Sequence, residues 1–270
     1  MWCFKNAQPV ASVALQDRAF QYGDGCFSTA RIVKGQIQLA NRHYERLNYA
    51  CQQLGLNVDL KLIEQSLQQL IHQEIALTGT LKLLISRGEG PRGYSVPDHN
   101  ADLYVFFYPQ AYSNTAPQYV EIGLLPRRIG LTMPDMVGIK TLNRLEQVLL
   151  KQQADQYGWA EALVADLNGN IVEGVSSNCF IYLNNAWITP ELRYNGVRGL
   201  MRTEILDRAQ QAGIDILERQ IHLDELDQVQ ALFFCNTLHP MTIASRMHSR
   251  SLSTEACLTL FHTLKLNQID

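Results

Sequence analysis

The sequence lacks the patterns that mark the common nucleotide, metal and hydrolase sites. It contains no Walker loop, no His-Glu-x-x-His and no Gly-x-Ser-x-Gly. The six cysteines are widely spaced and form no Cys-x-x-Cys pair, so they are expected to be reduced, buried thiols of a cytoplasmic protein. The seven histidines show no ligand-like spacing, and no metal site is expected.

Long apolar runs and basic runs are also missing. No stretch approaches the roughly 18 to 20 apolar residues that a membrane span requires, and the N-terminus does not have the pattern of a signal peptide. The 23 Lys and Arg residues are scattered and the formal net charge is -3, which argues against a nucleic-acid partner. With 270 residues, 46% of them hydrophobic, the chain has material for one large or two medium domains.

The first part of the chain alternates strand and helix patterns. Residues 10–40 read as strands with short turns, and Asn41 is a plausible N-cap of a helix that ends at Gly55. A second amphipathic helix is expected near residues 60–70, and strands at 81–85 and 103–107 flank a glycine-rich loop, 87–94.

The second part is expected to be richer in strands. Asn168-Gly169 between apolar alternations predicts a hairpin of 162–166 with 171–173, with both turn residues at positive φ. Another hairpin is expected around Asn184-Asn185, and a helix after Gly199. The sequence therefore predicts an α/β (α+β) fold with a small N-terminal domain (1–110), a polar linker (111–118) and a larger, strand-rich C-terminal domain (119–270).

One lysine stands in a distinctive place. Lys140 follows an apolar approach and precedes an expected helix that carries Leu142, Leu145 and Leu149 on one face. A helix N-terminus and apolar neighbours both favour a neutral amine, which a lysine needs to bond covalently to an aldehyde. Most lysines are solvated surface charges, so the context of Lys140 is not decisive. Lys82, on an expected strand, and Lys151, on an expected helix, remain alternatives.

The run Asp17-Arg18-Ala19-Phe20-Gln21-Tyr22-Gly23-Asp24-Gly25-Cys26-Phe27 resembles the N-terminal signature of the fold-type IV enzymes that use pyridoxal phosphate (PLP). Further blocks match in the same order over about residues 10–245. They are His43-Tyr44-Glu45-Arg46-Leu47, Gly138-Ile139-Lys140 with Asn143, Glu173-Gly174-Val175-Ser176-Ser177-Asn178-Cys179-Phe180, and Gly199-Leu200-Met201-Arg202.

The resemblance implies a role for each matching residue. Lys140 would bind PLP covalently, Glu173 would pair with its ring nitrogen, and Arg46 would bind its phosphate. Backbone amides of Leu200 and Met201 would bind the phosphate at a helix start, although many relatives have threonine in place of Met201. Further residues would close the cofactor pocket (Asn236 and Thr237), face the cofactor (Thr29 and Asn143) or bind substrate (Arg92 and Tyr94).

Within that group, the runs 23–31 and 140–148 look most like aminodeoxychorismate lyase. The resemblance implies conversion of 4-amino-4-deoxychorismate into 4-aminobenzoate and pyruvate, a step toward folate, by a homodimer. The alternatives are a D-amino-acid or branched-chain aminotransferase that uses the same lysine, and a PLP-binding or interaction protein without turnover. In relatives of the D-amino-acid type the position of Tyr94 holds a histidine, so the carboxylate-binding loop differs here.

Overall fold

A computed structural model describes residues 1–73, 75–111 and 116–270 and separates the chain into two compact units. The first unit comprises Met1–Ser113, Ile139–Asn143 and Asp270, and the second comprises Asn114–Gly138 and Arg144–Ile269. The division therefore moves a five-residue segment that contains Lys140 into the N-terminal unit. The expected linker, 111–118, lies partly outside the described residues, and strand β7 begins at its last position, Gln118.

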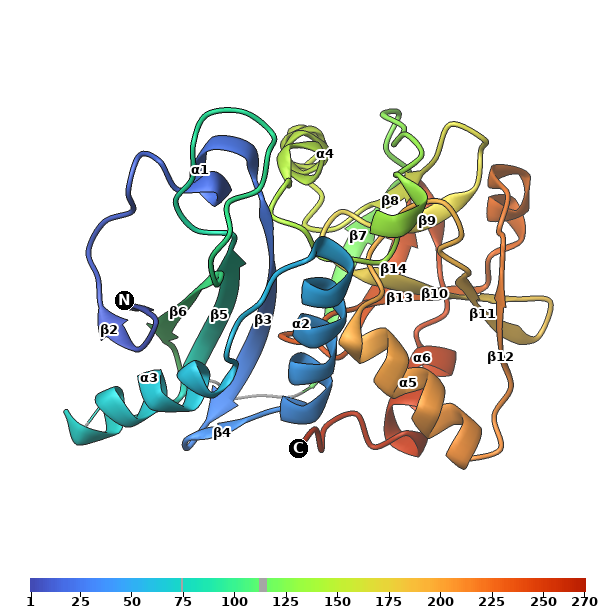
Figure 1. Cartoon of the computed structure of the whole chain (residues 1–270). Helices are drawn as coiled ribbons and strands as arrows, with labels where there is room; N and C mark the ends of the chain where they lie inside the picture. The colour runs from blue at the N-terminus through green and yellow to red at the C-terminus, as the bar shows by residue number, and fades with distance from the viewer. Residues whose placement is uncertain (74, 112–115) are drawn as a thin grey trace. The chain divides into compact units, whose positions relative to one another are not determined.

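The first unit is built on a six-stranded antiparallel sheet, in the order β2-β1-β6-β5-β3-β4 (Figure 1). Along its long strands the buried side chains alternate with less buried ones, as expected when one face meets the core. The strands are β1 (Trp2–Lys5), β2 (Gln8–Pro9), β3 (Gly25–Val33), β4 (Gln36–Ile37), β5 (Gly79–Ser86) and β6 (Asp102–Pro109).

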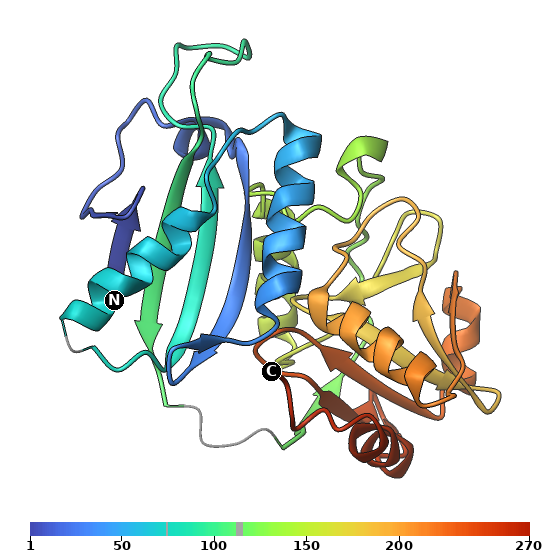
Figure 2. The ribbon, with the colours of Figure 1, turned by 60° about the horizontal axis from the view of Figure 1, so that its bottom comes forward.

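Helices α2 (Ala40–Leu54) and α3 (Lys61–His72) cover one face of this sheet (Figures 1 and 2). Their apolar stripes, at steps of three and four, pack into one core with β3, β5 and β6, so both expected helices and both expected strands are confirmed. The expected N-cap was wrong, because Leu39 occupies that position and Asn41 lies inside α2. A short helix, α1 (Arg18–Tyr22), replaces part of the expected strand region, and Asp17 caps it.

The second unit contains a seven-stranded mixed sheet, with β12-β11-β10-β13-β14-β15 in order and β7 parallel to β14. Helix α5 (Leu200–Gln211) packs near β12, and α6 (Glu255–Thr263) packs near β13. The strands of this sheet are β7 (Gln118–Ile122), β10 (Asn178–Leu183), β11 (Ala186–Pro190), β12 (Ile216–Arg219), β13 (Ala231–Cys235), β14 (Thr242–Met247) and β15 (Arg250–Ser251). Two 3-10 helices, Pro134–Met136 and Leu223–Gln228, complete the unit together with helix α4 (Leu145–Gln156) and a separate hairpin.

The two expected hairpins form, but one differs in its turn. Strands β8 (Leu163–Ala165) and β9 (Ile171–Gly174) pair with a register shift, and only Gly169 of the expected turn pair has positive φ. The Asp166 carboxylate accepts hydrogen bonds from the backbone of Asn168 and Asn170, so a side-chain cap shapes this turn. In the hairpin of β10 and β11, Asn184 and Asn185 form the expected turn, and both have the positive φ that a tight turn of this kind needs.

Helix α4 (Leu145–Gln156) starts later than expected and exposes its apolar side chains. Leu145 is 71% exposed, Val148 60% and Leu149 38%, whereas Leu150 and Ala154 are buried. The helix face that carries Leu145 and Leu149 therefore lies largely at the surface of the single chain.

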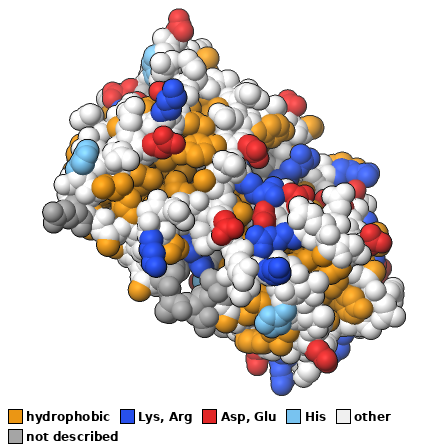
Figure 3. Space-filling view, turned by 90° about the horizontal axis from the view of Figure 1, so that it is seen from below, with side chains coloured by type: hydrophobic (Ala, Val, Ile, Leu, Met, Phe, Trp, Pro, Cys, Tyr) orange, Lys and Arg blue, Asp and Glu red, His pale blue; other side chains and the backbone are white. Residues whose placement is uncertain are grey.

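No helix among the described residues is long and apolar enough to span a membrane. Those residues also include no cluster of His, Cys, Asp and Glu that could hold a metal ion. On the face in Figure 3, acidic and basic side chains are interspersed.

Candidate active site

Lys140 is positioned by the open edge of strand β3. Along one edge, β3 pairs with β5 over most of its length. Along the other edge it pairs with β4 only at Ile32 and Val33, so no strand of the sheet covers that edge of its N-terminal half. The segment Ile139–Asn143 occupies that edge. The Phe27 N–H donates to the Lys140 carbonyl (3.0 Å), and the Leu142 N–H donates to the Gly25 carbonyl (3.0 Å). Backbone hydrogen bonds thus fix where the lysine side chain begins.

The Lys140 amine lies 4.7 Å from the centre of the Phe27 ring. The Lys82 amine lies 5.1 Å from the same ring. Thr29 shares this face of β3, because alternate residues of a strand point to the same side. The expectation that Lys140 stands at a helix start was wrong, since α4 begins only at Leu145.

Arg46 reaches β3 from helix α2. Its Nη2 donates a hydrogen bond to the Ser28 hydroxyl, and its Nε is buried without a hydrogen-bond partner. Among the described residues, no carboxylate pairs with this guanidinium. Burial lowers the pKa of Arg46 to about 10, so it still carries its charge at neutral pH. A buried cation without a counter-ion is costly, and an anion would relieve that cost.

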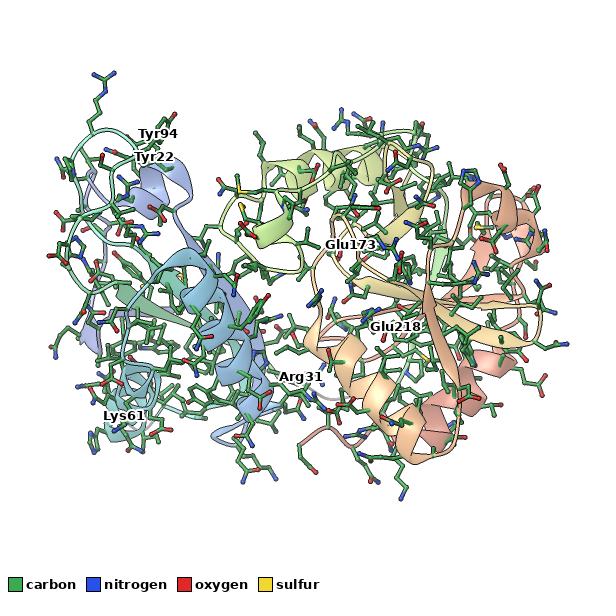
Figure 4. The ribbon with its side chains drawn as sticks, turned by 45° about the vertical axis from the view of Figure 1, so that its right-hand side comes forward. Tyr22, Arg31, Lys61, Tyr94, Glu173 and Glu218 are labelled. Carbon is green, nitrogen blue, oxygen red and sulfur yellow. The ribbon has the colours of Figure 1, made fainter. Side chains whose placement is uncertain are left out.

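Glu173, labelled in Figure 4, is the last but one residue of strand β9 and is buried. Its Oε2 accepts a hydrogen bond from the Val197 N–H (3.0 Å) and lies 3.5 Å from the Asn178 amide nitrogen. Burial lowers the pKa of Arg144, while the charge of Glu173 opposes that shift, so the two residues lie within electrostatic reach. The carboxylate is therefore oriented by donors of its own unit.

The start of helix α5 lies beside Glu173. Asn178 donates to the Val197 carbonyl (2.9 Å), and a Cβ on Gly199 would stand 2.0 Å from its Oδ1, so only glycine fits there. No side chain caps α5, which leaves the first amides, including those of Leu200 and Met201, without a capping side chain. Such a helix start attracts anions.

Asn236 and Thr237 follow strand β13 in the same unit. The Asn236 amide donates to the Ser177 hydroxyl (3.0 Å), and its oxygen accepts from the backbone of Leu238 and His239. The side chain therefore ties the loop after β13 to the loop that follows Glu173. Thr237 is partly buried.

The glycine-rich loop of the first unit holds Arg92 and Tyr94 at the surface, Tyr94 being 88% exposed. Figure 4 shows Tyr94 beside Tyr22 of α1, and their ring centres are 5.8 Å apart. Gly93 precedes Tyr94 in the loop. Its carbonyl accepts a hydrogen bond from the Arg18 guanidinium (2.9 Å), and its N–H donates to the Tyr22 hydroxyl (2.9 Å). Two hydrogen bonds and one ring contact thus anchor the loop to α1.

Asn143 is exposed and bonds back to the end of α1. Its amide nitrogen donates to the Gly23 carbonyl (3.2 Å), and its Oδ1 would stand 2.3 Å from a Cβ at that glycine. Gly23 has φ +66°, a conformation that favours glycine, and a Cβ there would displace the Asn143 side chain.

Three residues that contribute to these arrangements were not assigned a role from the sequence. Ser28, on β3, accepts a hydrogen bond from Arg46 and lies within hydrogen-bond distance of His43, on α2. Buried Glu161 accepts hydrogen bonds from the backbone of Val175 and from Ser176, and so shapes the loop after Glu173. Burial raises the pKa of Glu161, against these hydrogen bonds. His43 does stand in a block that carries the family resemblance, whereas Glu161 has no sequence signal.

Comparison with known proteins shows the family to which the chain belongs. The family model for class IV amino-transferases matches residues 25–247, so the chain belongs to that family, the fold-type IV enzymes. Pyridoxal phosphate is the cofactor of this class. The resemblance predicted from the sequence, the fold class and the cofactor are thereby confirmed.

Individual relatives show which enzymes of the family the chain resembles. The chain is 32% identical over 238 residues to an aminodeoxychorismate lyase of Vibrio harveyi, with 86% of each chain covered. It is 28% identical over 233 residues to a D-alanine aminotransferase of Bacillus licheniformis, covering 84% of this chain and 80% of that one. The crystal structure of 4-amino-4-deoxychorismate lyase from Pseudomonas aeruginosa superposes with a TM-score of 0.87 at 30% identity, covering 97% of this chain and 98% of that chain.

Proposed function

We propose that Lys140 binds pyridoxal phosphate covalently, that Arg46 and the start of α5 bind its phosphate, and that Glu173 pairs with its ring nitrogen. Each assignment has support within its own unit. Arg46 is a half-buried cation whose Nε is enclosed and which has no carboxylate partner among the described residues, and the N-cap residue of α5, Gly199, offers no side-chain cap. Glu173 is a buried carboxylate oriented by the Val197 N–H. Asn236 and Thr237 would complete the phosphate pocket.

The reaction that we propose is the conversion of 4-amino-4-deoxychorismate into 4-aminobenzoate and pyruvate, a step of folate biosynthesis. The observation that carries this choice is the 32% identity to an aminodeoxychorismate lyase over 86% of both chains. The 30% identity to the Pseudomonas aeruginosa lyase over nearly the whole chain supports it. The reaction needs no second substrate, because the bond between the ring carbon and the enolpyruvyl oxygen breaks as the ring becomes aromatic.

When bound, the cofactor would supply an electron sink for the ring carbon that bears the substrate's nitrogen. Lys140 acts as the general base and removes the proton from that carbon. Glu173 keeps the proton on the cofactor's ring nitrogen, which makes the electron withdrawal effective. Lys140 then returns the proton to the departing enolpyruvate, which leaves as pyruvate.

The substrate would be held by residues of the first unit. Arg92, on the glycine-rich loop, would bind a substrate carboxylate, with Tyr94 beside it. Thr29 shares a strand face with Phe27, whose ring lies 4.7 Å from the Lys140 amine, and would therefore face the cofactor. Asn143 would hold the end of α1 in place through Gly23.

A two-substrate assay tests the proposal. Purified protein with PLP receives 4-amino-4-deoxychorismate alone or, in parallel, D-alanine with 2-oxoglutarate. The lyase gives fluorescent 4-aminobenzoate without any keto acid, and Lys140→Ala abolishes the product. Pyruvate that forms only with the keto acid present would refute the lyase in favour of a transaminase.

A D-amino-acid or branched-chain aminotransferase is the second candidate, favoured by the 28% identity to a D-alanine aminotransferase. It would use the same lysine to move a proton between two carbons. A PLP-binding protein without turnover is the third; protein that carries the cofactor on Lys140 and converts neither substrate set would support it.

We further propose a homodimer that works in the cytoplasm. The support for the dimer is the apolar face of α4, where Leu145, Val148 and Leu149 are exposed in the single chain. A second copy of the chain would remove these side chains from water. The six free cysteines are consistent with a reducing compartment.

A further inference from the structure

The Ser28 hydroxyl joins two residues of helix α2 inside the first unit. Ser28 is fully buried on β3, and its side chain points toward α2, whereas Phe27 and Thr29 point to the opposite face. His43 and Arg46 are three positions apart on α2 and so share one side of the helix. The Ser28 oxygen accepts a hydrogen bond from Arg46 and lies 2.5 Å from Nδ1 of His43.

The protons in this cluster can be assigned by elimination. A guanidinium only donates, so the Ser28 oxygen accepts from Arg46. Burial lowers the pKa of His43 to about 3, with the charge of Arg46 adding to the effect, so the imidazole is neutral at neutral pH. Within the described part of the chain the Ser28 hydroxyl has no partner other than these two residues, and its proton therefore goes to Nδ1 of His43. The imidazole then carries its own proton on Nε2, which is buried without a partner.

This arrangement restrains a side chain that is otherwise mobile. Arginine loses much rotamer freedom when it is held in one orientation, and a binding site that is ordered in advance does not lose that entropy when the ligand arrives. Ser28 directs one nitrogen of Arg46, and His43 fixes the rotation of the Ser28 hydroxyl. The guanidinium is thereby oriented before any anion binds.

We infer that Ser28 and His43 are positioning residues that orient Arg46 for the phosphate of the cofactor. The inference rests on the proposed role of Arg46 and adds two residues that act only through it. Ser28 points to the face of β3 opposite Phe27, and His43 meets Ser28 on that same side. Neither side chain is therefore expected to touch the reacting groups.

The test compares binding of PLP and of pyridoxal, which has the same aldehyde but no phosphate, to the apoprotein. Binding is followed by the absorbance of the aldehyde bonded to Lys140. Ser28→Ala and His43→Leu are expected to weaken PLP binding about tenfold, the effect of losing a hydrogen bond to a charged group. Pyridoxal binding should stay unchanged. His43→Asn, whose amide can accept from Ser28, should restore most of the PLP affinity, and Arg42→Met on the same helix is the control.

A double-variant comparison separates this inference from the proposed function. In an Arg46→Gln background, Ser28→Ala should cause no further loss of PLP affinity, because its effect passes through Arg46. Equal losses for PLP and pyridoxal in Ser28→Ala, or no loss for either, would overturn the positioning role while Arg46→Gln still discriminates against PLP. If Arg46→Gln itself leaves the preference for PLP over pyridoxal unchanged, the phosphate role of Arg46 fails as well.

Discussion

Replacing Arg46 by methionine should move cofactor affinity and apoprotein stability in opposite directions. The Arg46 side chain is half-buried with its Nε enclosed, and it has no carboxylate partner among the described residues. Its pKa falls from 12.5 to about 10, so burial disfavours the charged form by about 3 kcal/mol. Methionine keeps most of the apolar stem without the charge, and the apoprotein should therefore become more stable.

The cofactor should respond the other way. A guanidinium about 4 Å from a phosphate charge gains about 4 kcal/mol at an effective dielectric constant of about 20. Loss of the hydrogen bonds and charge together should weaken PLP binding by about 2–4 kcal/mol, or about 30- to 1000-fold. Pyridoxal, without the phosphate, should bind almost as before.

The assay combines thermal unfolding of the apoprotein with titration of PLP and pyridoxal. We expect Arg46→Met to raise the apoprotein melting temperature by a few degrees, since about 1 kcal/mol corresponds to about 2–4 °C for a chain of this size. Arg42→Met, on the same helix, controls for the change in net charge. A less stable apoprotein with unchanged PLP affinity would refute the view that Arg46 awaits an anion.

Other predictions concern separate features. Glu173→Gln should lower kcat about 100-fold or more, because an amide cannot hold the proton on the cofactor's ring nitrogen, and Glu173→Asp should retain more activity; equal kcat for Gln and wild type would contradict the assignment. The low pKa of His43, about 3, means that the unfolded chain binds one more proton between pH 3 and 6.5. Stability should therefore fall by about 1.4 kcal/mol per pH unit as pH drops through that window, a contribution that urea unfolding at pH 5 and 7 should find missing in His43→Leu. Leu145→Glu together with Val148→Glu should give monomers in sedimentation, whereas Leu167→Glu, at an equally exposed leucine, should not; a dimer in both would exclude the α4 face as the interface.

Local patterns in the sequence predicted most of the elements. Apolar residues at steps of three and four gave α2 and α3, and strand periodicity gave β5 and β6, because these patterns follow from which side of an element meets the core. The errors came from competing local interactions. Leu39, not Asn41, is the N-cap residue of α2. In the turn at Asn168-Gly169, the Asp166 carboxylate caps the backbone, and only Gly169 has positive φ.

The family and its cofactor could be predicted from short blocks of sequence, because the chemistry of a covalently bound aldehyde restricts which residues can stand in them. Sequence could not place Lys140. Periodicity put it at a helix start, whereas the helix begins five residues later and the lysine is held by the edge of β3. A free strand edge is a property of the sheet order, which no local pattern encodes.

The sequence by itself determined the class of enzyme and the residues that we propose to bind the cofactor. Tertiary structure alone decided how those residues are held. Arg46 donates a hydrogen bond to Ser28, Glu173 accepts one from the Val197 N–H, and the Lys140 backbone is hydrogen-bonded to the edge of β3. It also decided that the apolar face of α4 lies at the surface. The physical reason is that each of these contacts joins residues distant in sequence, and such pairs meet only when the sheets and helices have packed.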